Sequence, residues 1–190
     1  MTARWVVDGV QKQRDLDITW QPISLYFKNE PDKENTRFAW YERSHNLLRV
    51  MESIRVREGN KAVQNYYWEL GRRIHHDKNF MDFNLEDALI SIGVSSNHVA
   101  AYENPTFDEE IRTRMSGGIE LAGDDIGTPI IAFKDPSGKK VGIFGPVITR
   151  VLEEDESVKL WDSVVTLTTT PGFWELKRTR TEKPNFGERP

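Results

Sequence analysis

A hairpin-like segment constrains the fold of this chain more than any other feature. A Thr-Pro pair at 128–129 opens an apolar run from 130 to 133, and a Pro-Ser-Gly turn at 136–138 leads into a second apolar run from 141 to 144. Short apolar runs on either side of such a turn predict two antiparallel strands. Proline lacks an N–H group, so Pro129 suits the first position of a strand, where the missing donor faces an edge.

Length and charge limit the classes of protein to consider. The 190 residues suit one domain, or a domain with a large insertion, and the formal net charge of −4 gives no general attraction for phosphate backbones. We therefore expect no nucleic-acid partner. No apolar run approaches the roughly 20 residues that cross a bilayer, and residues 1–5 lack the apolar core of a secretion signal. These features predict a soluble, cytoplasmic protein with no membrane partner.

The chain contains no cysteine and four histidines. Without cysteine, the polypeptide as written has no disulfide, no thiolate metal ligand and no thiol nucleophile. The histidines show neither the HxH nor the HExxH spacing of common zinc sites, so no metal site is expected.

The first part of the chain predicts a helix and then a strand. Residues 2–14 have the apolar spacing of a helix that starts without a cap residue, as though it continued an earlier element. Residues 16–26 are rich in aromatic and branched side chains and predict a strand, with Pro22 at an edge or a bulge.

A block of helices follows. Apolar residues at helical spacing predict two amphipathic helices over 38–58 and 60–78, with Gly59 at the break. Helix-capping residues then predict three more helix starts, at Asn84, at Ser95 or Ser96, and at Thr106. Beyond the hairpin, helices are expected near 147–152 and 157–167.

This order of elements is similar to the thioredoxin fold with an all-helical insertion, as in DsbA-like oxidoreductases and kappa-class glutathione transferases. We therefore expect an α/β, thioredoxin-like (DsbA-like) fold divided into 1–36 (helix and strand), 37–126 (helical insertion) and 127–190 (hairpin and C-terminal helices). Five segments resemble the actinobacterial DsbA-like family of mycothiol-dependent reductases. They are Gly71 to His75, Ala122 to Pro129, Phe144 to Pro146, Lys159 to Asp162, and Phe173 to Glu182.

The resemblance implies that the active-site cysteines precede this chain. In the family, a first strand leads into Cys-Pro-aromatic-Cys, and residues 1–5 match the end of the pattern that follows. The second cysteine would then stand two residues before Met1. A misplaced start, a shortened chain or a natural cysteine-free paralogue would each explain this. The first central strand would also be missing, which would leave two unpaired sheet edges and favour a compensating homodimer.

The resemblance also implies roles for four residues. Thr128 and a cis-Pro129 would form the wall that faces the thiolate, with an ordinary trans-proline at a strand start as the alternative. His75 would face the dithiol, or else be a solvated residue at a helix end. Asn29 would line the pocket, or else be a turn residue in a polar loop.

By resemblance, the function is thiol-disulfide oxidoreduction of a small thiol or disulfide substrate, with mycothiol or a related thiol as reductant and nitro-compound reduction as a further possibility. The chain as written would be inactive in that chemistry, because it lacks the nucleophilic cysteines. Two alternatives stay open. One is a cysteine-free, non-catalytic binding protein, and the other is an enzyme like the kappa glutathione transferases and 2-hydroxychromene-2-carboxylate isomerases.

Overall fold

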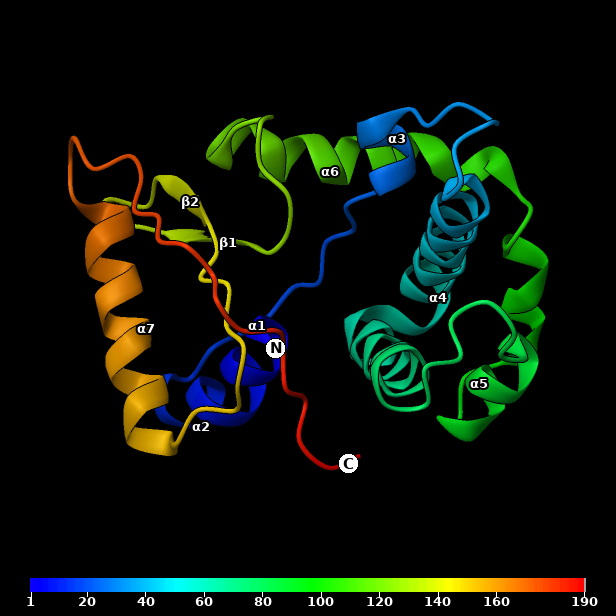
Figure 1. Ribbon diagram of the computed structural model, residues 1–190, viewed down its shortest axis with the longest axis horizontal. Helices are drawn as coiled ribbons and strands as arrows, with labels where there is room; N and C mark the ends of the chain where they lie inside the picture. Colours follow the sequence, from blue (N-terminus) through cyan, green and yellow to red (C-terminus); the bar gives the residue numbers. More distant parts are fainter. Residues whose placement is uncertain (190) are drawn as a thin grey trace. The chain divides into compact units, whose positions relative to one another are not determined.

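The computed structural model describes residues 1–189, which are mostly helical with one small two-stranded sheet (Figure 1). The chain divides into two compact units. The terminal unit comprises Met1–Ile18 and Gly118–Glu188, and the helical unit comprises Thr19–Gly117 with Arg189. Residues 19–36, which the thioredoxin-like division groups with the terminal segments, pack within the helical unit.

The elements of each unit follow the chain. Those of the terminal unit are α1 (Thr2–Arg4), the π-helical segment η1 (Trp5–Val10), α2 (Gln11–Arg14), β1 (Ile130–Lys134), β2 (Lys140–Phe144) and α7 (Glu154–Thr169). Those of the helical unit are α3 (Leu25–Asn29), α4 (Phe38–Gly71), the π-helical segment η2 (Arg72–His76), α5 (Leu85–Ser91), and the 3-10 segments η3 (Ser96–Ala101) and η4 (Pro105–Phe107). Helix α6 (Asp108–Ala122) begins in the helical unit and ends in the terminal unit.

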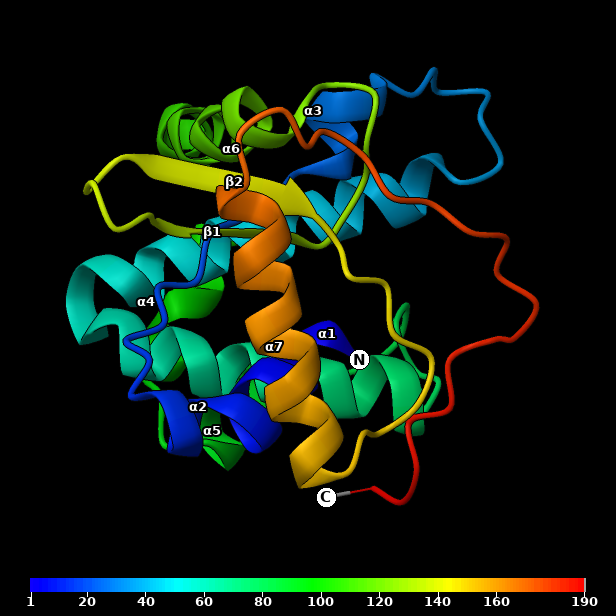
Figure 2. The same cartoon turned by 90° about the vertical axis from the view of Figure 1, so that its left-hand side faces the viewer.

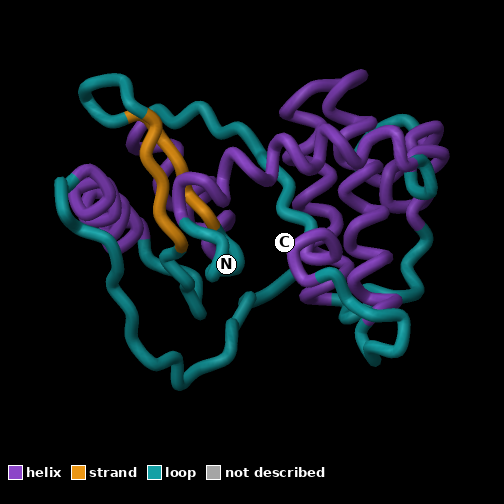
Figure 3. The backbone as a smooth tube through the Cα atoms, turned by 90° about the horizontal axis from the view of Figure 1, so that it is seen from above, coloured by secondary structure: helices purple, strands orange, loops and turns teal. Residues whose placement is uncertain are grey.

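The predicted hairpin is confirmed (Figure 3, orange). Strands β1 and β2 pair antiparallel, with Ile130 opposite Phe144 and Lys134 opposite Lys140. Asp135 organises the turn, because its Oδ1 accepts hydrogen bonds from the backbone N–H groups of Ser137 and Lys139, both at 2.9 Å. An aspartate that bonds the backbone two residues ahead is a common turn-forming device.

The opening helix, formed by α1, η1 and α2, packs against α7 (Figure 2). Trp5 is 4 % exposed, its ring lies 5.9 Å from that of Trp161, and its indole N–H donates to the Ser157 carbonyl at 3.0 Å. Val10 and Val164 complete the buried centre of this unit. The helix predicted over 2–14 is therefore confirmed, and its apolar side forms the core of the terminal unit.

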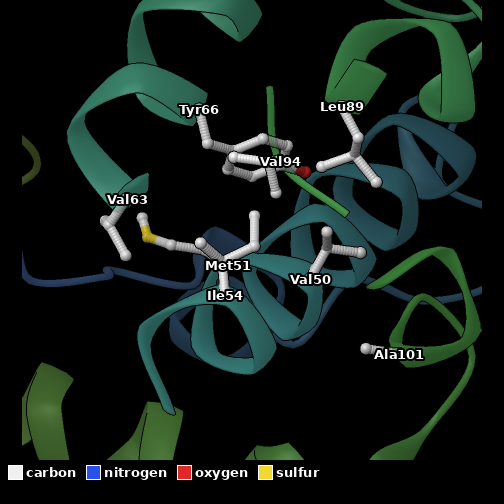
Figure 4. Packing of buried hydrophobic residues seen from close by; sticks show 8 residues of the cluster. All are labelled: Val50, Met51, Ile54, Val63, Tyr66, Leu89, Val94 and Ala101. Atoms are coloured by element: carbon white, nitrogen blue, oxygen red, sulfur yellow. The ribbon is translucent and has the colours of Figure 1, made fainter. Parts of the chain in front are cut away.

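The helical unit has a separate core around α4. Gly59 interrupts α4 with φ 82° and ψ −178°, a backbone conformation open almost only to glycine, so the predicted break between two helices is confirmed. The chain folds back at this break and brings together side chains from both halves of α4 and from the helices that follow (Figure 4). The buried members are Val50, Met51, Ile54, Val63, Tyr66, Leu89, Val94 and Ala101.

The predictions of a strand over residues 16–26 and of a helix near 147–152 are wrong. Residues 16–24 form no strand; Ser24 instead caps α3 by accepting the Phe27 N–H at 3.2 Å. A strand requires a neighbour with matching backbone groups, and the sheet described within residues 1–189 holds only β1 and β2. Residues 147–152 are not helical either. They form an extended connection in which the Thr149 carbonyl accepts the Asn185 N–H at 2.7 Å.

Candidate functional site

The predicted wall residues stand at one end of the hairpin. Thr128 is exposed, Pro129 is half-buried, and the peptide bond between them is cis. The peptide bond between Gly145 and Pro146 is also cis, and the Gly145 N–H donates to the Pro129 carbonyl at 2.8 Å. This bond continues the hairpin ladder by one pair, so the two proline segments lie next to each other.

The start of the opening helix lies against the same place. The Thr2 hydroxyl donates to the Pro146 carbonyl at 2.7 Å, and Thr2 is only 7 % exposed. Two hydrogen bonds therefore join the first turn of the helix, through Pro146 and Gly145, to the Pro129 segment. The first N–H groups of a helix and its dipole favour an anion close to this end.

Close packing behind this turn determines the position of the opening helix. A Cβ atom on Gly9 would lie 2.4 Å from the Oγ atom and 2.7 Å from the Cβ atom of Ser157, distances that ordinary contacts do not reach. Ser157 is 1 % exposed and belongs to α7. Gly9 therefore lets the helix approach α7 closely enough for Trp5 to reach the Ser157 carbonyl.

His75 and Asn29 belong to the other unit. His75 lies in η2 with an exposed side chain, and its partial desolvation lowers the pKa of the imidazole below the ordinary value. Asn29 is the exposed last residue of α3. The roles of both residues toward a dithiol stay predictions.

The sequence did not single out Thr2 or Pro146 as site residues, although Gly145-Pro146 is part of one family-like segment. The pairing register of the predicted hairpin could have pointed to Pro146. If Ile130 pairs with Phe144, then Pro129 lies opposite Gly145, and Pro146 is the next residue on that side of the hairpin. The bond between Thr2 and Pro146 joins residues 144 positions apart, which no local pattern reveals.

A buried polar network in the helical unit was also not predicted. The Ser24 hydroxyl lies 3.0 Å from His45 Nδ1, and His45 Nε2 lies 3.1 Å from Asp108 Oδ1. Burial lowers the pKa of His45, against the influence of Asp108. Burial tends to raise the pKa of Asp108, but hydrogen bonds from Arg49 outweigh it and hold that pKa below the ordinary value. The network consists of a neutral imidazole beside an ionised carboxylate.

Within residues 1–189, no group of three or more histidine or acidic side chains is arranged to hold a metal ion. In the same residues, no helix combines the length and apolar character that crossing a membrane requires.

Comparison with known protein families gives a match over residues 1–178 to the family described as Rv2466c-like, mycothiol-dependent nitroreductase Rv2466c. The chain belongs to this family. Membership in the Rv2466c-like family confirms the resemblance to the mycothiol-dependent reductases. The match includes parts of both units, so Thr128 and Pro129 as well as His75 and Asn29 lie within the matched residues.

Proposed function

We propose that this chain provides the thioredoxin-like body of a thiol-dependent reductase. Mycothiol or a related small thiol would supply the electrons, and a nitro compound or a disulfide would accept them. The observation that carries the proposal is the link from Thr2 through Pro146 and Gly145 to Pro129, because it joins a helix start to the proline wall. Membership in the Rv2466c-like family supports it.

The chemistry follows from this arrangement. With a Cys-Pro-x-Cys segment ahead of Met1, the opening helix would begin in that segment. A thiolate at this new helix start would be stabilised by the free backbone N–H groups there and by the helix dipole, which lower the pKa of the thiol. Pro129 has no N–H group of its own, so the backbone of Thr128 is left to pair with an extended substrate. Two thiols joined as one disulfide release two electrons and two protons, which reduce one acceptor.

The nucleophile is the remaining requirement. These 190 residues contain no cysteine, so on their own they form no mixed disulfide and would be inactive in this chemistry. A Cys-Pro-x-Cys segment joined ahead of Met1, with the strand that leads into it, would supply the thiolate. Without it, pairing between two copies would cover the exposed sheet edges. The lack of cysteine also favours a second candidate, a non-catalytic protein that binds a thiol or its substrate.

The test is a gain of function. The 190-residue chain is compared with the same chain extended by a strand and Cys-Pro-x-Cys, and with a control extension carrying Ser-Pro-x-Ser. The readout is mycothiol-dependent loss of nitroaromatic absorbance together with formation of mycothiol disulfide. We expect activity only with the cysteine extension. Equal activity in all three, or none in any, would rule the proposal out, and binding of mycothiol without turnover would favour the second candidate.

Thr2 gives an internal check on the site. Thr2→Val in the extended chain removes the hydrogen bond to Pro146 and keeps the shape of the side chain. We expect a loss of about 1 kcal/mol in the free energy of unfolding, and a larger fractional loss of turnover than in an exposed control, Thr113→Val.

A further inference from the structure

A second buried histidine in the helical unit lies between a serine and a carboxylate. The Ser53 hydroxyl lies 2.8 Å from His98 Nδ1, and His98 Nε2 lies 2.8 Å from Glu58 Oε1. His98 is 3 % exposed and Ser53 is 7 % exposed, while the Glu58 side chain is 29 % exposed. The three residues come from α4 and η3.

The Glu58 carboxylate determines which ring nitrogen of His98 carries the hydrogen. A carboxylate oxygen accepts hydrogen bonds, so in the neutral tautomer that fits this contact the imidazole hydrogen is on Nε2 and points to Glu58 Oε1. His98 Nδ1 is then an acceptor, and the Ser53 hydroxyl must donate to it. This is the polarity of a serine activated by a histidine base that a carboxylate orients. The two ring nitrogens are exchanged relative to the usual serine hydrolase arrangement, but the direction of proton transfer is the same.

The network of Ser24, His45 and Asp108 can be compared with that of Ser53, His98 and Glu58, because both place a histidine between a serine and a carboxylate. Ser24 Oγ already accepts the Phe27 N–H as the cap of α3, and it is 1 % exposed. Its carboxylate, Asp108, is held by two hydrogen bonds from Arg49 at 2.6 and 2.8 Å. In the other network, Glu58 has no arginine partner within residues 1–189, and its Oε1 accepts hydrogen bonds from the His98 ring and the Ser95 N–H. The first network is thus held by a helix cap and by an arginine ion pair, neither of which the second network has within residues 1–189.

The network of Ser53, His98 and Glu58 opens onto a cavity. Ser53, His98 and Glu58 line a cavity of about 500 Å³, large enough for a small organic molecule. Val56 and Phe107 provide apolar surface there, and Val56 is 75 % exposed. The carbonyl of the Asn104 side chain accepts the Thr106 N–H at 3.0 Å, so its NH₂ group is left as a donor in the same lining.

We propose that this cavity is a second active site, separate from the thiol chemistry, which hydrolyses small esters with a short apolar acyl chain. Ser53 is the nucleophile, His98 the general base, and Glu58 the residue that positions His98. Val56 and Phe107 contact the acyl chain. Arg57 lies in the same lining and has no ion-pair partner in residues 1–189, which favours esters that also carry a carboxylate.

The reaction balances with water as the second substrate. Ser53 Oγ bonds to the acyl carbon as its proton passes to His98 Nδ1, and the ester C–O bond then breaks as that proton moves to the departing alkoxide. The products of this half are an acyl-serine and an alcohol. Water next gives a proton to His98 Nδ1 while its oxygen attacks the acyl carbon. The Ser53–acyl bond breaks, the proton returns to Ser53, and a carboxylic acid leaves.

The first test uses the unmodified chain. A fluorophosphonate probe is incubated with the 190-residue chain, and the labelled residue is mapped by mass spectrometry. We expect the label on Ser53, no label on Ser24, and loss of labelling in His98→Asn. We also expect hydrolysis of p-nitrophenyl butyrate to fall by 100-fold or more in Ser53→Ala and to persist in Ser24→Ala. Glu58→Gln should shift the pH profile of hydrolysis rather than abolish it.

A second measurement covers the case in which Ser53→Ala fails to fold. The chain contains no cysteine, so Ser53→Cys creates a single thiol whose alkylation by iodoacetamide can be followed against pH. If His98 is the base, this thiol should titrate below the ordinary value of about 8.5 and react faster than that of Ser24→Cys. Absence of probe on Ser53, or equal reactivity of the two thiols, would overturn the proposal. Neither result bears on the thiol-dependent reductase activity, which needs the cysteine extension.

Discussion

At Gly9 the opening helix lies close against α7. A methyl group there would meet both the Oγ and the Cβ atom of Ser157, at 2.4 and 2.7 Å. We predict that Gly9→Ala lowers the free energy of unfolding by about 1–3 kcal/mol, because a packed core has no room for the added atom. Urea unfolding followed by tryptophan fluorescence would measure this through the buried Trp5 and Trp161.

Two variants control this prediction. Gly117→Ala adds a methyl group to helix α6 with no atom within 4 Å, so it should stabilise by about 0.5–1 kcal/mol. Ser157→Gly removes both atoms that the new Cβ atom meets, so the double variant with Gly9→Ala should lose less stability than the sum of the single changes. Additive losses would mean that the contact is not the cause.

His45 should make the stability depend on pH. Its pKa is lowered in the folded protein, chiefly by burial, so the unfolded chain binds the proton more readily. The stability is therefore complete above about pH 6.5, the unfolded value, and is lost as the pH falls from there to the folded pKa. Asp108 stays ionised in this window because its own pKa is lowered.

The measurement is urea unfolding of the full chain between pH 7.5 and 5. We expect the wild type to lose more stability over this range than His45→Gln, which keeps a polar side chain but does not titrate. His76→Gln, in the π-helical segment η2, is the matched histidine control. A wild type whose stability does not change between these two pH values would contradict the prediction.

Only some of the residues of the two candidate sites could be predicted from the sequence. Thr128 and Pro129 could be picked out because a Thr-Pro pair that opens an apolar strand is a local pattern, and the family resemblance then implied their role. Thr2 and His98 did not, because their importance arises from contacts with Pro146 and Ser53, which are remote in the chain. A threonine and a histidine on helices carry no local signal of such contacts.

At the scale of the element, charged side chains stabilise the start of α7. Glu153 and Glu156 form a capping box, and Glu156 also accepts two hydrogen bonds from Arg150, at 2.9 and 2.8 Å. The bonds from Arg150, followed by the Glu153 N–H, lower the pKa of Glu156 to about 2. This carboxylate therefore supports the helix start above about pH 4.5, and its support is lost as the pH falls toward 2.

Carboxyl NMR would test this directly. We expect the Glu156 side chain to titrate near 2 in the wild type, and Arg150→Gln to move its midpoint up toward 4.5. High salt should move it in the same direction, because both side chains are exposed and salt screens such pairs. A wild-type midpoint already near 4.5 would show that the pair does not form in solution.

Elements were predictable where their cause is local. The helices after Gly59 and Asn84, and the hairpin around Asp135, follow from backbone freedom, capping and turn chemistry. The strand predicted over 16–26 failed because strand propensity describes only how a segment fits a sheet, and the segment lacks a neighbouring strand. Residues 147–152 failed because their apolar side chains, Ile148 and Leu152, pack in an extended connection rather than on a helix face.

At the scale of the whole molecule, the two units have separate hydrophobic cores. Every member of the core around Val50, and of the adjoining cluster around Phe83, lies between residues 19 and 117. The core around Trp5 and Trp161 draws only on the terminal unit. We predict that a fragment of residues 19–122, which keeps α6 whole, folds on its own into a helical protein.

Far-UV circular dichroism and thermal unfolding of this fragment would check the prediction. A cooperative transition and a helical spectrum are expected, and Val50→Ala should lower the melting temperature in the fragment and in the full chain alike, because it removes buried volume from the same core. A fragment without cooperative unfolding would mean that the helical unit depends on the terminal unit.

The insertion of one unit within the chain of the other has a consequence for biosynthesis. The ribosome makes Trp5 early but makes its partner Trp161 only after the entire helical unit. At ordinary rates of translation this delay lasts about 10–30 s. During that time the apolar side of the nascent opening helix has no core to enter, and it is the natural binding target for a chaperone.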